Sequence, residues 1–190
     1  MSDDSPFELH TSQIEKYQQD GHLTVNRLFS DEQIAEAVAD IEQWQREFMA
    51  ALQPEQKKWY LEGVGNGEQR LRKLDNPVFH RPVFLQFARH PPLVRCVEQL
   101  IGPGLRVWFS QVFMKPPGGG GPKPVHQDNF YFGPSNLDGV ITVWIALDEA
   151  TIQNGCLYYG NGSNRGDVLP HVAPPDEPFN LQLSREIAAT

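Results

Sequence analysis

The sequence has little cysteine and no long hydrophobic run, and both absences narrow the class of protein. Its two cysteines, Cys96 and Cys156, are far apart and form no Cys-x-x-Cys pair, so they predict thiols in a reducing compartment and no disulfide framework. Nowhere do about 18 apolar residues follow one another, so no membrane-spanning helix is expected. The acidic start, residues 1–6, has no apolar run behind it, which argues against a signal peptide. These features predict a cytoplasmic protein.

Positive charge is also scarce. The chain has 16 lysines and arginines against 24 aspartates and glutamates, a formal net charge of −8. An acidic surface repels phosphate backbones and anionic lipid, so we expect no nucleic-acid partner and no membrane partner. Hydrophobic residues make up 39% of the 190 residues, and a chain of this length can bury a sizeable core. We therefore expect a single domain over residues 1–190.

Helix signals begin near the N-terminus. Ser12 and Glu15 have the Ser-x-x-Glu spacing of a capping box, which predicts a helix start there. Gly21 is expected to end that helix. Residues 22–29 then alternate between apolar and polar side chains, as in a strand.

A second capping signature starts at Ser30. The apolar residues behind it recur every three or four positions, which predicts an amphipathic helix to about residue 52. Residues 53–75 are polar and contain glycines, so a surface loop is expected. A further helix is predicted from Pro91 to a stop at Gly102.

The second half of the chain is rich in strand signals. Strand-like segments lie at residues 105–115, 125–132, 139–148 and 155–159. Short strands separated by glycine, proline and asparagine are typical of a β-sandwich or barrel. We predict an α+β fold in which a helix-rich part, about residues 12–104, flanks a jelly-roll-like part, about residues 105–190.

One pair of side chains suggests metal chemistry. His126 and Asp128 are two positions apart in the strand-like segment 125–132. Side chains at i and i+2 of a strand point to the same face, so an imidazole and a carboxylate would project together. With a second histidine they would form the two-His-one-carboxylate face of non-haem Fe(II) oxygenases. The alternative is a hydrogen-bonded pair on a strand edge with no metal.

Several motifs together resemble one known family. They are His-Gln-Asp at 126–128, Trp-Ile-Ala-Leu-Asp at 144–148, Asn-Gly-Cys-Leu at 154–157, Lys-Pro-Pro at 115–117 and the segment 17–23. Their combination resembles the phytanoyl-CoA dioxygenase family over residues 12–171. This resemblance implies a double-stranded β-helix, a cupin-like jelly roll, and an Fe(II)- and 2-oxoglutarate-dependent dioxygenase that uses O₂ to hydroxylate a small organic substrate.

The resemblance also implies site residues. His126 and Asp128 match the family's first two iron ligands, and the residues expected near the cofactor are Met114, Lys115, Gln127 and Trp144. Trp144 could instead be a core aromatic residue. Lys115 could instead keep its ammonium in water.

The chain departs from the family in two places. Asn161 and Asn164 replace the proline and histidine of a Pro-Gly-Ser-His segment. The distal histidine and the arginine that pairs with 2-oxoglutarate are not matched. His171 is expected to be a loop histidine bonded to backbone, and Arg165 and Arg185 are the candidates for the carboxylate-binding arginine.

These departures leave alternatives open. The jelly roll is expected to be incomplete at its C-terminus, so the chain is either a fragment of a longer protein or completes the roll with another copy as a homo-oligomer. The alternative function is a catalytically silent or truncated family member that acts as a binding or assembly module. A cupin-like isomerase would need further His or Glu ligands.

Overall fold

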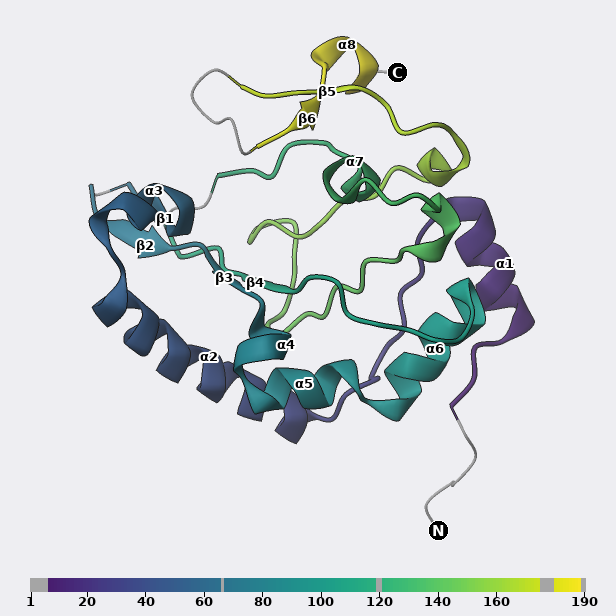
Figure 1. The fold of residues 1–190 in the computed structure, drawn as a ribbon, viewed down its shortest axis with the longest axis horizontal. Coiled ribbons are helices and arrows are strands. Elements are labelled where there is room, and N and C mark those ends of the chain that lie inside the picture. The colour runs from purple at the N-terminus through teal and green to yellow at the C-terminus, as the bar shows by residue number, and fades with distance from the viewer. Residues whose placement is uncertain (1–6, 66, 119–120, 175–179, 189–190) are drawn as a thin grey trace.

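The fold was analysed in a computed structural model, which describes residues 7–65, 67–118, 121–174 and 180–188 (Figure 1). The helices are α1 (Thr11–Asp20), α2 (Asp31–Ala51), α3 (Lys57–Tyr60), α4 (Pro77–His80), α5 (Pro82–Ala88), α6 (Pro91–Ile101), α7 (Asp128–Phe132) and α8 (Arg185–Ala188), with 3₁₀ turns at Pro54–Gln56, Leu137–Gly139 and Ser163–Arg165. The strands are β1 (Leu61–Gly63), β2 (Gln69–Leu71), β3 (Lys73–Asp75), β4 (Gln111–Phe113), β5 (His171–Val172) and β6 (Gln182–Leu183).

The predicted helices of the first part are confirmed, with one change at a helix start. At α2, the Ser30 hydroxyl accepts from the Gln33 N–H at 3.3 Å, and the Gln33 side chain accepts from the Ser30 N–H at 2.8 Å. The start of α1 lies before the predicted cap, because the Gln13 side chain accepts from the N–H of His10 at 2.9 Å. Gly21 ends α1 in the left-handed region, at φ +82.

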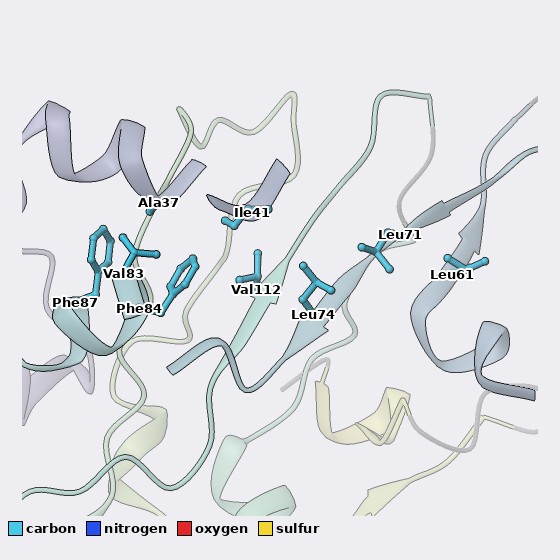
Figure 2. Close-up of a cluster of buried hydrophobic side chains, with 9 residues drawn as sticks. All are labelled: Ala37, Ile41, Leu61, Leu71, Leu74, Val83, Phe84, Phe87 and Val112. Carbon is cyan, nitrogen blue, oxygen red and sulfur yellow. The ribbon is translucent and has the colours of Figure 1, made fainter. Parts of the chain in front are cut away.

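The core lies between the helices of the first part and a small sheet. Ala37 of α2 and Leu74 of β3 are both 0% exposed. Figure 2 shows the cluster running from α5 past α2 to the paired strands β3 and β4 and on to β1. Arg81 fixes the start of α5 against α2, because its guanidinium donates two hydrogen bonds of 2.8 Å to the carboxylate of Asp40.

The prediction of a surface loop over residues 53–75 is wrong. This stretch forms α3, β1, β2 and β3, and Leu61, Leu71 and Leu74 from it are buried in the core. β1 pairs with β2, and β3 pairs with the distant β4, both antiparallel. Each of these strands has three residues and needs only one apolar side chain in the core. A segment that is polar on average can therefore still form strands.

The strand predicted at residues 22–29 is also not formed. Arg27 adopts a positive φ of 56°, which breaks the extended run. No ladder partner is assigned to this segment among the described residues. A strand needs inter-strand hydrogen bonds, so alternation of side chains alone did not suffice.

The predicted strands of the second part are mostly extended chain without a ladder. Of residues 105–115 only β4 is a strand, and residues 140–146 and 156–160 belong to no assigned helix or strand. In the described part of the chain, three two-stranded antiparallel sheets are present and no closed barrel is formed. The α+β composition is therefore present, while a double-stranded β-helix stays a prediction.

Figure 1 shows how the two parts lie. Helices α2 and α5 form one layer, α1 and α6 lie at one end, and the extended segments cross the middle toward α7 and the β5–β6 pair. Across the described residues, no helix combines the length and apolar character needed to cross a membrane.

Candidate metal centre

The two predicted metal ligands, His126 and Asp128, lie together just before and at the start of the short helix α7. The strand predicted at residues 125–132 is wrong in its second half, because residues 128–132 form the short helix α7. Gly133 ends this helix in the left-handed region. Gln127 before it is extended, at φ −112 and ψ 126. The residues on either side of an extended residue share a face, and His126 Nε2 lies 3.2 Å from Asp128 Oδ1.

Each member of the pair is held by a second partner. His126 Nδ1 lies 2.7 Å from the carbonyl oxygen of Pro124, so Nδ1–H donates to this carbonyl and leaves Nε2 on the Asp128 side. The Thr142 hydroxyl donates to the other carboxylate oxygen of Asp128 at 2.6 Å. Orienting bonds of this kind on the remote atoms of a histidine and a carboxylate are typical of metal sites.

The electrostatics of the pair favour the ionised carboxylate. The pKa of Asp128 is lowered, chiefly by the hydrogen bond with His126 and also by that from Thr142, while burial opposes the shift. The pKa of His126 is raised, chiefly by the same hydrogen bond to Asp128, against the effect of burial. A divalent cation between the two atoms would replace the proton that they share.

Gln127 ties the pair to the segment from Asp167 to His171. Its backbone N–H donates to His171 Nε2 at 2.9 Å, and its side-chain oxygen accepts from the Leu169 N–H at 2.7 Å. His171 Nδ1 donates to the carbonyl of Leu169 at 2.8 Å. Both ring nitrogens of His171 therefore bond to backbone groups, as predicted. The predicted loop position is wrong, because His171 begins strand β5 and is paired with Leu183.

The other predicted cofactor residues lie on neighbouring segments. Met114 packs against the core. Lys115 Nζ donates to the carbonyl of Gly155 at 2.8 Å. Trp144 is 47% exposed and lies two residues after Thr142, the partner of Asp128. Among the described residues, no hydrogen bond or ion pair joins these three side chains to the metal pair.

Of the two candidate arginines, only one has a described side chain. Arg165 folds over Gly162, whose N–H donates to the carbonyl of Asp20 at 2.9 Å, so this arginine lies at the end of α1. The side chain of Arg185 lies outside the described part. Across the residues that the structure describes, no group of three His, Cys, Asp or Glu side chains could hold a metal ion.

Sequence reasoning missed the residues that orient the pair. Thr142 is separated from Asp128 by 14 positions, and Pro124 acts through its carbonyl, which carries no side-chain signal. The one available signal for Thr142 was its place two residues before Trp144 in a segment predicted to be extended. A hydroxyl at that spacing faces the same side as the tryptophan.

Comparisons with known proteins identify relatives of this chain. The chain is 26% identical over 177 residues to a probable alpha-ketoglutarate-dependent hypophosphite dioxygenase from Stutzerimonas stutzeri, covering 93% of this chain and 61% of that protein. It is 27% identical over 181 residues to the peroxisomal phytanoyl-CoA dioxygenase of Rattus norvegicus, covering 87% and 51%. It is 26% identical over 206 residues to phytanoyl-CoA dioxygenase domain-containing protein 1 of Mus musculus, covering 88% and 70%.

The chain thus spans 61% and 51% of the first two of these relatives. The model of the phytanoyl-CoA dioxygenase family matches residues 17–187, which include both members of the metal pair and both of their orienting partners. The chain belongs to the phytanoyl-CoA dioxygenase family.

Proposed function

We propose that this chain carries part of the active site of a non-haem Fe(II)- and 2-oxoglutarate-dependent dioxygenase that hydroxylates a small organic substrate. His126 Nε2 and Asp128 Oδ1 would hold the iron. The bound iron would supply the site for O₂ and, with 2-oxoglutarate as co-substrate, the oxidising power for hydroxylation. Membership of the family and the similarity to a probable alpha-ketoglutarate-dependent dioxygenase support this proposal.

One observation carries the proposal. The two donor atoms lie side by side, and the other polar atom of each side chain, His126 Nδ1 and Asp128 Oδ2, is held by a hydrogen bond. His126 Nε2 and Asp128 Oδ1 are 3.2 Å apart, a separation at which both can bind one ion. Pro124 fixes the imidazole and Thr142 fixes the carboxylate. The chemistry of this donor set, one nitrogen and one oxygen, fits Fe(II).

The finer features of the fold and site belong to the same proposal. The extended segments around residues 105–115, 140–146 and 156–160 would be strands of a double-stranded β-helix. Met114, Lys115, Gln127 and Trp144 would lie near the co-substrate, and Arg165 or Arg185 would bind its carboxylate. A third ligand would come from a group that the described residues do not supply. The cytoplasmic location, the substrate and a homo-oligomer stay predictions.

An anaerobic titration tests the proposal. The purified chain would receive Fe(II) and then 2-oxoglutarate, while the visible spectrum is followed for the weak charge-transfer band of iron-bound 2-oxoglutarate. We expect a saturable band that is lost in His126→Ala and retained in His80→Ala, which removes an exposed histidine beside Trp44. A band that persists in His126→Ala would contradict the assignment of the ligand.

A second candidate function rests on the two-ligand geometry itself. Because the described residues contain no group of three metal-binding side chains, the chain could act as a catalytically silent binding or assembly module. Two ligands bind a divalent ion weakly, and the loss of a charge-assisted clamp on 2-oxoglutarate costs about 1.5–3 kcal/mol. A folded chain that shows no band with iron and 2-oxoglutarate would favour this alternative.

A further inference from the structure

A cavity beside helix α2 shares no described lining residue with the metal pair. Its volume is about 550 Å³, within the range of about 300–1,000 Å³ that is typical of small-molecule sites. The lining comes from α2, α3, β3 and the segment around α4. It includes three aromatic rings, two carboxylates and a guanidinium: Trp44, Phe48, Tyr60, Glu47, Asp75 and Arg81.

The aromatic side chains present part of their surface to this cavity. Trp44 and Phe48 are four positions apart on α2, so they lie on the same side of the helix. Tyr60 ends α3 and meets Phe48 edge to face, with the ring centroids 4.8 Å apart. All three rings are only partly buried against the core. The face of an aromatic ring carries partial negative charge and attracts cations, most strongly at tryptophan.

The charges around the cavity also favour a cation. Arg81 donates two hydrogen bonds of 2.8 Å to Asp40 and one of 3.1 Å to Glu47. Lys73 is paired with Asp75 at 3.1 Å. Together these groups are three carboxylates and two basic side chains, which leaves one net negative charge. The most accessible carboxylate is that of Glu47, with 51% of its side chain exposed against 21% for Asp40 and 25% for Asp75, so an incoming cation meets Glu47 first.

The chain itself holds one ammonium in this environment. Lys73 Nζ lies 5.2 Å from the centroid of the Tyr60 ring and 3.1 Å from Asp75 Oδ2. The pKa of Tyr60 is raised, first by burial and then by the charge and hydrogen bond of Asp75, so the ring stays neutral. A ring and a carboxylate thus hold a cation together at this cavity. Trp44 and Glu47, three positions apart on α2, offer the same combination.

We propose that this cavity binds a small organic cation with a substituted ammonium head, which lies against the Trp44 ring with its charge beside Glu47. A fully substituted ammonium has no N–H to donate, so its attraction to Glu47 is one of charge. The hydrogen bonds that Glu47 accepts from Gln43 and Arg81 therefore stay in place. Binding at this cavity needs no metal and does not rest on the dioxygenase function proposed above.

An NMR titration of the ¹⁵N-labelled chain tests this inference. The probe is choline, and its control is dimethylbutanol, the neutral alcohol in which carbon replaces the nitrogen of choline. The indole N–H of Trp44 reports on binding. We expect saturable shifts with choline and an affinity at least about tenfold higher than for the alcohol, because only choline gains the cation–π and carboxylate attraction. Equal affinities, or no saturable shift with choline, would overturn the proposal.

Two variants locate the cation within the cavity, with circular dichroism to verify folding. Trp44→Leu should weaken choline binding by about tenfold through loss of the ring face. Glu47→Gln should weaken it by about threefold, a smaller effect because solvent screens this exposed carboxylate. Trp108→Leu changes a tryptophan that is 70% exposed elsewhere, and Glu36→Gln changes an exposed carboxylate on the same helix. Both controls should bind choline as wild type does.

Further outcomes separate this cavity from the proposed metal centre. The choline titration is repeated with Co(II) present and in His126→Ala, and the affinity should be the same in each case. A choline affinity that falls in His126→Ala would place the cation at the metal pair and overturn the assignment to the cavity. Unchanged choline affinity in folded Glu47→Gln and Trp44→Leu chains would overturn it as well, whatever metal the chain binds.

Discussion

The two parts of the chain differ in how they use their apolar side chains. All members of the buried core cluster lie between Ala37 and Val112. Beyond Val112 of β4, the second part adds only partly buried side chains to it, including Ile145 and Leu147. It exposes large apolar residues such as Val125, Trp144, Ile152, Leu157, Tyr158 and Tyr159, at 44–76%. The buried core is therefore built by the segment from Ala37 to Val112, while the part with the two candidate ligands leaves more of its apolar surface exposed.

This difference indicates that the hydrophobic stabilisation and the candidate binding site come from different segments of the chain. Hydrophobic burial contributes about 25 cal/mol for each Å² of apolar surface removed from water, so we expect the segment from Ala37 to Val112 to supply most of the hydrophobic stabilisation. The second part contributes hydrogen bonds at the site, such as those of Thr142 and Pro124 with the pair. Changes in the first part should alter stability, and changes in the second should alter metal binding.

The largest effect is expected in the core. Leu74→Ala should lower the free energy of unfolding by about 2–5 kcal/mol, because Leu74 is 0% exposed and its truncation leaves a cavity. Leu157→Ala is the matched change in the second part, where the leucine is 44% exposed, and should cost about 0.5 kcal/mol or less. Urea unfolding measures both. Equal losses would break the comparison.

The ion pair between α2 and α5 should have the next largest effect. Arg81→Met removes two hydrogen bonds to Asp40 from side chains that are only 17% and 21% exposed. We expect a loss of about 1–2 kcal/mol. The exposed pair of Arg70 with Glu68, at 48% and 58%, is the control, and Arg70→Met should change stability by about 0.5 kcal/mol at most. A similar loss in both variants would contradict this ranking.

An effect on binding is expected at the residue that orients Asp128. Thr142→Val keeps the shape of the side chain and removes the hydroxyl that donates to the carboxylate. Co(II) affinity should fall by about tenfold, as for other outer partners of metal ligands, with little change in unfolding. Ser163→Ala removes a hydroxyl that bonds the carbonyl of Gly160 in the same part of the chain and should not change affinity. Calorimetric titration would show either result.

The smallest expected effect is a shift of one pKa. Asp128→Asn replaces the carboxylate whose hydrogen bond is the chief cause of the raised pKa of His126. This pKa should therefore fall toward its ordinary value, because a carboxylate acceptor favours the imidazolium form. The metal-free chain is titrated by NMR at the His126 ring protons. Asp138→Asn removes a carboxylate from another turn and should leave the His126 pKa in place. An unchanged value in Asp128→Asn would show that the ion pair does not form in solution.

Local sequence signals predicted the helical part well. The capping residues at Ser30 and the apolar spacing that follows it are contained within one helix, so the sequence suffices to place α2. The same holds for α6, with prolines at its start and Gly102 at its end. The pairing of β3 with β4 joins Leu74 to Val112 across 38 positions, and no local pattern encodes such a partner.

The sequence predicted that His126 and Asp128 lie together, and it did not predict the residues that orient them. His126 and Asp128 are two positions apart, so their convergence follows from the backbone of one residue between them. The bonds of Thr142, Pro124 and His171 depend on how distant segments or a backbone carbonyl are placed. The strands predicted around the site failed for the same reason, since a ladder requires a partner strand as well as an alternating sequence.

The most direct test of the account is the metal affinity of the pair. Wild type, His126→Ala and His80→Ala would be titrated with Co(II) by calorimetry, with circular dichroism to verify folding. We predict one site in wild type and His80→Ala. In His126→Ala the loss should exceed the about tenfold drop expected for an outer partner. Unchanged affinity in a folded His126→Ala chain would contradict the metal centre, and with it the central claim about the function of this part of the protein.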